Sequence, residues 1–339
     1  MMSGRTHWRG AAGVALALVA FEILLRGLAS GNPTLDSKRG WVYRGTTVRH
    51  LLSEGHGISH WDASGNRESP FRPARPSSRF LVVGDSTTEA LQVSDAEVYT
   101  ARLEEILQHA GWRAAVLNAG RSSLSAADYI AGAPSYLDEF RPTWAIVQLR
   151  LNDLTTDCRI PTRTHFLEGD GGLRVEVVMP GFGRVSALLG EFRRTSALIN
   201  QTIARAGVFK ASARLPPMFR GGADTPPPVA PAAKPDYPIE DELAMLAASW
   251  GGRLTIALIP DATAPLGDIE RRTLAYARNH GISIVDLREV FPEFDRRGSS
   301  PFGFSNSMFG VGHLNSEGHD ALARLLAAEL KDLRALGLL

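Results

Sequence analysis

The stretch Phe80-Leu-Val-Val-Gly-Asp-Ser-Thr-Thr-Glu89 decides how the rest of the sequence is interpreted. Its first four residues form an uninterrupted apolar run with the length of a buried strand. Gly84 then permits a tight turn, and a helix-like segment follows it. A continuously apolar strand followed directly by a helix is typical of a parallel sheet that is covered on both faces.

Four further apolar runs of strand length follow along the chain, and helical patterns lie between them. Helices are expected from the capping box at Ser94 to Gly111, after Ser125, over 268–280 and over 317–333. The alternation predicts an α/β fold, a three-layer α/β/α domain with a five-stranded, mostly parallel, flavodoxin-like sheet. The five expected strands are Phe80–Val83, Ala114–Leu117, Trp144–Leu149, Leu254–Ile259 and Ile282–Leu287.

Composition excludes several classes of protein. The 339 residues carry 37 basic and 36 acidic side chains, and the formal net charge of +1 argues against a nucleic-acid binder. Hydrophobic residues make up 44% of the chain, which is enough to bury a large core. The one cysteine, Cys158, can build neither a disulfide framework nor a cysteine-based metal site. The cysteine count thus excludes a cysteine-based metal site, and the mechanism that the motifs described below imply requires no metal and no cofactor.

The N-terminal segment, residues 1–30, is predicted to be a signal anchor or a signal peptide. Arg5 and Arg9 precede an apolar run, Ala11–Leu25, which only Glu22 interrupts. With its flanks the run reaches the roughly 20 residues that a membrane span requires. We expect the cell membrane as a partner, with the bulk of the chain in the periplasm or outside. Gly27-Leu-Ala29 would allow cleavage and secretion instead.

The rest of the chain divides into two parts. Residues 31–78 are rich in Gly, Ser, Arg and Pro, and they are expected to form an irregular lead-in to a domain over 79–339. Residues 155–250 interrupt the strand–helix rhythm. They are predicted to hold an amphipathic helix, Val185–Phe209, and an exposed proline-rich loop over 216–238.

Polar residues follow several of the predicted strands at one edge of the sheet, where parallel α/β folds bind ligands. Ser86 follows the first strand, Asn118-Ala-Gly120 the second, and Arg150-Leu-Asn152-Asp153 the third, while His313 precedes the last helix. Each residue alone is better explained as a cap, a turn or a surface side chain. Together they predict a site with a serine nucleophile and a histidine base.

These residues resemble the sequence blocks of the SGNH (GDSL-type) hydrolase superfamily of serine esterases and acyltransferases, over about residues 79–336. The matching stretches are Val82-Val-Gly-Asp-Ser-Thr-Thr-Glu89, Asn118-Ala-Gly120, Asn152-Asp153 and His313-Leu-Asn-Ser-Glu-Gly-His319. The resemblance implies Ser86 as the nucleophile and His313 as the general base. It also implies that the N–H groups of Ser86 and Gly120 and the Asn152 side chain form the oxyanion hole.

The sequence departs from the pattern of that superfamily in two places. An aspartate is expected three or two residues before the histidine, but Gly310 and Val311 occupy those positions. Either a backbone carbonyl orients His313, or an acid comes from elsewhere, with Asp153, Glu317 and Asp295 as candidates and Asp85 as a possible auxiliary group. The second departure is Arg150, which replaces a glycine and either faces solvent or contacts an anionic substrate.

The resemblance implies a serine-dependent ester hydrolase that acts on acyl esters of envelope glycans or lipids. A periplasmic O-acetyltransferase that modifies an exported polysaccharide is the alternative, because the same residues serve both reactions. A non-catalytic binding or assembly subunit is a third possibility, motivated by the missing aspartate. The pair His56 and His60 is expected to belong to a loop, and the sequence indicates no oligomeric state.

Overall fold

The computed structural model describes residues 3–28, 34–36, 40–50, 54–122, 124–150, 164–169, 172–177, 238–260 and 266–339. The chain divides into two compact units, each of which is described by itself. The first unit comprises Met1–Thr34 and Phe182–Ala232, and the second comprises Leu35–Gly181 and Ala233–Leu339. The sheet and the candidate site belong to the second unit.

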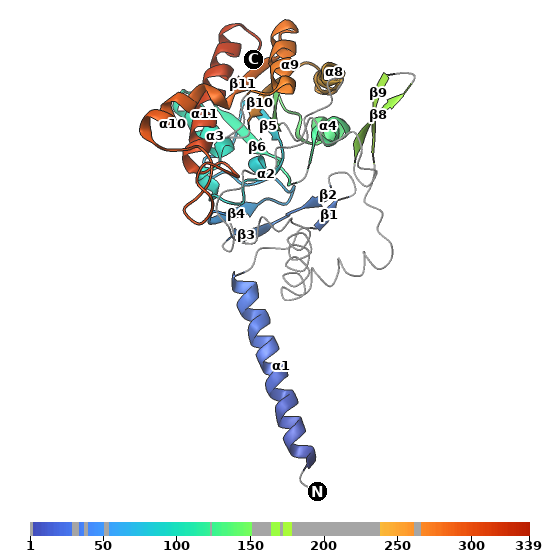
Figure 1. Cartoon of the computed structure of the whole chain (residues 1–339), viewed down its shortest axis with the longest axis vertical. Helices are drawn as coiled ribbons and strands as arrows, with labels where there is room; N and C mark the ends of the chain where they lie inside the picture. Colours follow the sequence, from blue (N-terminus) through green and yellow to red (C-terminus); the bar gives the residue numbers. More distant parts are fainter. Residues whose placement is uncertain are drawn as a thin grey trace. The chain divides into compact units, whose positions relative to one another are not determined.

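Helix α1 (Ser3–Leu28) is the described helix of the first unit (Figure 1). Among the helices that the structure describes, none is long and apolar enough to cross a membrane. The prediction of a single N-terminal membrane anchor, and with it of a location at the cell membrane, is therefore wrong. Glu22 and Arg26 place two charged side chains in this helix, and charged side chains are costly inside a bilayer.

The second unit contains the predicted five-stranded sheet, and all of its strand pairs are parallel. The strand order is β11-β10-β7-β5-β6, and Figure 1 shows β5 and β6 next to each other. From β5 the chain first adds β6 on one side and then crosses to add β7 on the other, so the direction in which strands are added reverses at β5. The carboxyl end of β5 is thus the place where this kind of fold opens a crevice. The strands are β5 (Ser78–Val83), β6 (Ala114–Asn118), β7 (Trp144–Arg150), β10 (Leu254–Ile259) and β11 (Ser283–Asp286).

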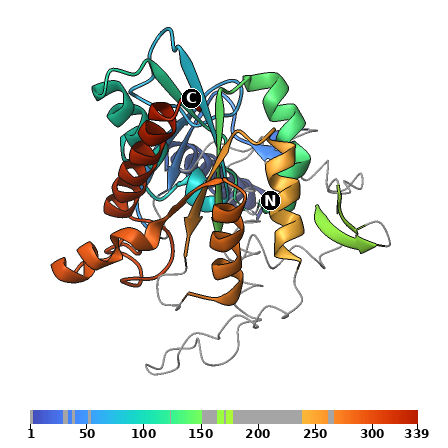
Figure 2. The same cartoon turned by 90° about the horizontal axis from the view of Figure 1, so that it is seen from above.

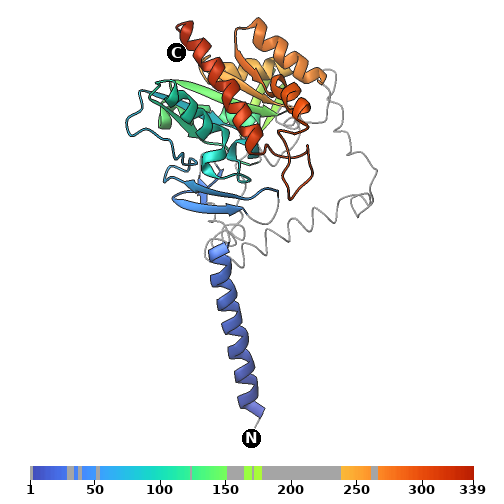
Figure 3. The same ribbon diagram turned by 90° about the vertical axis from the view of Figure 1, so that its left-hand side faces the viewer.

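Helices cover both faces of the sheet, which confirms the three-layer prediction (Figure 2). Alternate residues of β5 enter opposite cores, because successive side chains of a strand point to opposite faces. Phe80 and Val82 pack in one core and Leu81 and Val83 in the other, and all four are buried. Helices α3 (Tyr99–His109) and α11 (Ser316–Ala335) lie side by side on the first face (Figure 3), whereas α4 (Ala126–Phe140), α8 (Ile239–Ser249) and α9 (Asp268–Asn279) cover the second.

Local capping explains where these helices begin. Ser125 and Asp128 form a capping box at the start of α4, and the Asn315 side chain accepts from the Gly318 N–H (3.0 Å) at the start of α11. The box predicted at Ser94 is also present. It caps a short 3-10 turn, η1 (Asp95–Glu97), and α3 begins only at Tyr99.

The lead-in was expected to be irregular, and this expectation is wrong. It contains the strand pairs β1 (Thr34–Asp36) with β2 (Gly40–Val42) and β3 (Thr46–His50) with β4 (Gly57–Trp61). In β4, Gly57, Ser59 and Trp61 are buried while Ile58 and His60 are exposed. The buried positions of β4 carry no aliphatic side chain, so hydrophobic periodicity could not reveal the strand.

The region expected to interrupt the fold, 155–250, is described only in part. It contains an antiparallel hairpin of β8 (His165–Gly169) and β9 (Gly172–Glu176), and it ends in α8. The predicted helix 185–209, all but the last residue of the proline-rich loop 216–238, and Cys158 lie outside the described residues. After β11 the chain forms η4 (Leu287–Val290) and α10 (Phe291–Arg297) before the loop that leads to α11.

Candidate active site

Ser86 lies at the carboxyl end of β5, as predicted, and begins the short helix α2 (Ser86–Glu89). The Asp85 side chain accepts from the Thr87 N–H at 2.8 Å, so Asp85 serves as the helix cap. The Asp85 N–H donates to Gln148 Oε1 (3.1 Å), which ties the turn to β7. At Gly84 an added Cβ would lie 2.1 Å from Thr88 Oγ1, so only glycine fits this turn.

His313 reaches Ser86 from the far end of the sequence. Its Nε2 lies 2.9 Å from Ser86 Oγ, although the two residues are 227 positions apart. A bridge between Phe302 and Leu314 and a hydrogen bond from the Gly303 N–H to the His313 carbonyl (3.0 Å) close the base of the loop 303–312. The predicted pairing of Ser86 with His313 is therefore present in the geometry. A nucleophile within hydrogen-bond reach of a base is what acyl transfer through a serine requires.

No acid precedes His313 at positions 310 or 311, and in the structure Glu54, from the lead-in, contacts His313 instead. The Oε2 of Glu54 lies 2.5 Å from His313 Nδ1, and its Oε1 accepts from the His313 backbone N–H at 2.8 Å. The candidates that we had considered do not occupy this place. Glu317 pairs with Arg297, Asp295 is exposed on α10, and Asp153 lies outside the described residues.

The Glu54 carboxylate is suited to hold His313 in one tautomer. Burial alone raises the pKa of Glu54, but two hydrogen bonds from His313 and the charge of its imidazole outweigh burial, so the pKa lies below its ordinary value. Glu54 is therefore ionised at neutral pH. An ionised carboxylate accepts a hydrogen bond from Nδ1–H, which leaves Nε2 unprotonated and free to accept from the Ser86 hydroxyl.

The loop 303–312 holds the segment that carries Glu54. Asn306 brackets the Gly55 peptide: its Oδ1 accepts from the Gly55 N–H (2.8 Å) and its Nδ2 donates to the Gly55 carbonyl (3.1 Å). Gly312 adopts φ +99, and a Cβ there would lie 2.1 Å from Glu54 Oε1. The absence of a side chain at Gly312 thus leaves the space that the Glu54 carboxylate fills.

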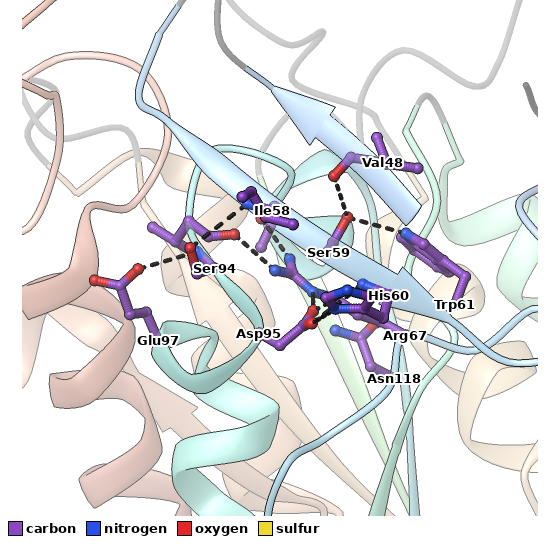
Figure 4. A network of polar contacts seen from close by, with 12 residues as sticks. Val48, Ile58, Ser59, His60, Trp61, Arg67, Ser94, Asp95, Glu97 and Asn118 are labelled. Carbon is purple, nitrogen blue, oxygen red and sulfur yellow. Dashed lines mark hydrogen bonds and ion pairs between the residues drawn. The ribbon is translucent and has the colours of Figure 1, made fainter. Parts of the chain in front are cut away.

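The buried Arg67 fixes the other end of the nucleophile's helix (Figure 4). Its Nη1 donates to the carbonyls of Glu89 (2.9 Å) and Ala90 (2.5 Å) at the end of α2, and its Nη2 donates to the Val93 carbonyl (2.6 Å). Its Nε donates to Asp95 Oδ1 at 2.9 Å. Arg67 therefore satisfies carbonyls that a helix end leaves unpaired and ties α2 to the β3–β4 hairpin.

Donors for an oxyanion are only partly described. Among the described residues, the Ser86 N–H meets no acceptor, as an oxyanion donor requires. The Gly120 N–H already donates to Asn118 Oδ1 at 2.9 Å, so it is engaged within the protein. Asn152 lies outside the described residues, and Arg150 ends β7 half-buried. The oxyanion roles of Gly120 and Asn152 and the substrate contact of Arg150 stay predictions.

The other histidines singled out in the sequence, His56, His60 and His319, make contacts outside the Ser86–His313–Glu54 series. His60 Nδ1 lies 2.6 Å from Asp95 Oδ2, whereas His56 Nε2 lies 3.2 Å from Asn306 Nδ2, so the two belong to different networks. Burial, reinforced by the positive charges of Arg67 and His313, lowers the pKa of His319 to about 3, and its neutral ring stacks on Tyr99. Within the described part of the chain, no cluster of His, Cys, Asp and Glu is arranged to hold a metal ion.

Comparison with known proteins finds solved structures of similar fold but low sequence identity. No family model matches the chain, and no curated protein matches it significantly. A catalytic mutant of Axe2, an acetylxylan esterase from Geobacillus stearothermophilus, is 15% identical, with 75% of this chain and 94% of that chain covered and a TM-score of 0.41. The lipase/acylhydrolase from Enterococcus faecalis is 14% identical, with 76% and 96% covered and a TM-score of 0.42.

A third similar structure is a member of the lipolytic protein G-D-S-L family from Veillonella parvula. It is 12% identical, with 75% of this chain and 97% of that chain covered and a TM-score of 0.37. These similarities are too distant to transfer an activity, so the chemistry of Ser86, His313 and Glu54 has to be argued from their own geometry.

Proposed function

We propose that this chain is a serine-dependent hydrolase of carboxylic esters. The observation that carries the proposal is the continuous series of contacts from Ser86 Oγ to His313 Nε2 (2.9 Å) and from His313 Nδ1 to Glu54 Oε2 (2.5 Å). A nucleophile, a base and an orienting carboxylate within hydrogen-bond reach of one another form the arrangement of a serine acyl-transfer site.

The first half of the reaction acylates Ser86. His313 Nε2 takes the hydroxyl proton as Oγ attacks the ester carbonyl, and the carbonyl π electrons move onto its oxygen. The Ser86 N–H, which meets no acceptor among the described residues, would donate to that oxygen, and one such donor is worth about 3 kcal/mol of barrier. The oxyanion then re-forms the carbonyl, the ester C–O bond breaks, and His313 returns the proton to the departing alcohol.

The second half releases the acid. Water loses a proton to His313 Nε2 and attacks the acyl carbon, and the Ser86 Oγ leaves with the proton that His313 held. During both halves the Glu54 carboxylate stabilises the imidazolium that forms on His313. If a sugar hydroxyl replaced water in this step, the same residues would transfer the acyl group, so the products have to be examined directly.

Glu54 also bears on the alternative of a non-catalytic subunit. That alternative was motivated by the missing aspartate before His313, and a carboxylate is present at the required atom. A binding protein would have no need for a half-buried Ser–His–Glu series at the crevice of its sheet.

The test is hydrolysis of p-nitrophenyl acetate by the full chain, beside Ser86→Ala and His313→Ala. The proposal expects turnover by the natural chain and a loss of at least about 10³-fold in kcat for each variant. Acetate should appear in solution even when a glycan is added. Turnover that survives in both variants would contradict the proposal, and acetylated glycan as the main product would convert it to a transferase.

A further inference from the structure

A second cavity, distinct from the catalytic edge, lies at the amino ends of the strands. It has a volume of about 560 Å³ and is lined by residues that begin or immediately precede four neighbouring strands, among them Ser78, Arg113, Thr143 and Arg253. Ser78 begins β5, whereas Ser86 follows its other end. A strand of 6 residues spans about 20 Å, so the two sites are separated by the length of β5 and lie at opposite ends of it.

The cavity is strongly basic. Three arginines line it, Arg113, Arg253 and Arg334, and none of the described lining residues is an aspartate or glutamate. A guanidinium is always charged in a protein, so the arginines bring three positive charges to the cavity, against the one carboxylate of Leu339, the last residue of the sequence, which also lines it. In a chain whose net charge is only +1, this is a local concentration of charge that the composition does not reveal.

These charges are not neutralised by the described part of the protein. Arg113 Nη2 donates to the Arg75 carbonyl (2.6 Å), and the Arg334 guanidinium lies 4.4 Å from the centre of the Trp112 ring. Neither of these, nor Arg253, forms an ion pair with a carboxylate that the structure describes.

Other arginines of the domain form ion pairs with carboxylates. Arg72 pairs with Glu104 at 3.3 Å, and Arg288 pairs with Glu270 and Asp286 at 3.0 Å. Among the described contacts, Arg113 donates one side-chain hydrogen bond, from Nη2, and Arg253 and Arg334 donate none, so N–H donors of all three guanidiniums remain for a ligand. The fork of N–H donors on a guanidinium matches two oxygens of a phosphate or carboxylate at once.

We propose that this cavity binds a small, multiply charged, phosphate-bearing molecule. Its volume falls within the range of about 300–1,000 Å³ that small-molecule sites occupy. Three guanidiniums are better balanced by a phosphate or pyrophosphate group than by a single carboxylate. The apolar walls formed by Phe80 and Leu338 suit an organic part attached to the phosphate.

Isothermal titration of the full chain with sodium pyrophosphate, in a phosphate-free buffer of low ionic strength, tests the proposal. We expect one pyrophosphate per chain, with affinity reduced at least about tenfold in Arg253→Gln and in Arg334→Gln, because each removes a charge-assisted pair of hydrogen bonds. Arg271→Gln, an exposed arginine that pairs with Asp268 on α9, is the matched control and should bind as the natural chain does.

Two comparisons make the outcome decisive. Citrate, a tricarboxylate, should bind at least about tenfold more weakly than pyrophosphate, and equal affinity would overturn the assignment to phosphate. Ester hydrolysis should be unchanged in Arg253→Gln, which shows that the variant is folded and that the cavity is separate from the catalytic site. No binding, or equal affinity for all three variants and the natural chain, would overturn the proposal.

Discussion

Glu54 Oε2 lies 2.5 Å from His313 Nδ1, although the two residues are 259 positions apart. The second oxygen of the same carboxylate accepts from the His313 backbone N–H at 2.8 Å. This two-point contact fixes both the tautomer of the imidazole and its position relative to the chain. The acid of the site thus comes from the segment before the α/β domain.

Replacing the carboxylate by an amide should impair catalysis without unfolding the domain. In Glu54→Gln the side chain keeps its size but favours the wrong tautomer of His313. In a serine protease the corresponding change lowers kcat about 10⁴-fold, and we expect a loss of at least about 10²-fold here, with KM little changed. Steady-state kinetics on p-nitrophenyl acetate measure it. Glu317→Gln, a change at an acid that pairs with Arg297, should retain full activity.

The lowered pKa of Glu54 predicts how stability depends on pH. Its folded-state pKa lies below the unfolded value of about 4.3, so its ionised form stabilises the fold above that pH. This contribution is lost as the pH falls through the folded pKa. The difference in unfolding free energy between the natural chain and Glu54→Gln should therefore shrink from pH 6 to pH 3. A difference that stays constant over this range would show that the carboxylate is not stabilised by His313.

Gly312 should tolerate no side chain, because a Cβ would meet Glu54 Oε1 at 2.1 Å. In Gly312→Ala the carboxylate must move away from His313, and we expect kcat to fall at least about tenfold. Gly310→Ala is the matched control from the same loop, since Gly310 has a similar positive φ of +75 but no atom nearer than 3.8 Å. Both variants carry a backbone strain of about 1–3 kcal/mol, so only the fall in kcat separates them. If Gly312→Ala and Gly310→Ala had the same kcat, the space at Gly312 would not be what positions Glu54.

Asn306 is predicted to be a positioning residue, because it brackets the Gly55 peptide next to Glu54. Asn306→Ala should lower kcat about tenfold and change KM less. The further change Glu54→Gln should then lower kcat by a smaller factor in the Asn306→Ala background than it does in the natural chain. A double-mutant cycle in kcat measures that coupling. Additive losses in the cycle would mean that Asn306 acts independently of Glu54.

Arg67 should dominate the stability of the region around α2. Replacing it with Met leaves several buried carbonyls without their donor and removes the Arg67 partner of Asp95, and such a change costs about 3–5 kcal/mol. Denaturant unfolding of Arg67→Met measures the loss. Arg324→Met removes an exposed pair with Asp320 on α11 and should cost less than about 1 kcal/mol. A small effect at Arg67 would contradict its role in fixing α2.

The sheet and most of its helices could be predicted because their physical signals are local. Leu254–Ile259 is uninterruptedly apolar, as a strand buried on both faces must be, and the structure has the strand at those residues. The Ser125 capping box marked the start of α4 in the same way. The placement of Ser86 and His313 also followed from the sequence, since both belong to motifs next to predictable elements.

Glu54 could not be predicted, and the reason is physical. Its partner lies across the fold, and nothing within the lead-in indicates that β3 and β4 bring it there. The buried positions of β4 are Gly57, Ser59 and Trp61, which carry no aliphatic pattern. Glycine at 312 was a signal in retrospect, because it removes a side chain where a carboxylate enters, but its φ is known only from the folded chain.

Labelling with a fluorophosphonate, followed by mass spectrometry of the modified peptide, tests the central claim most directly. The account predicts one label on Ser86 of the natural chain, no label on Ser86→Ala, and labelling of Glu54→Gln at least about 10²-fold more slowly. A label on another residue, no label on the natural chain, or an unchanged rate in Glu54→Gln would contradict the account of Ser86, His313 and Glu54 as one catalytic unit.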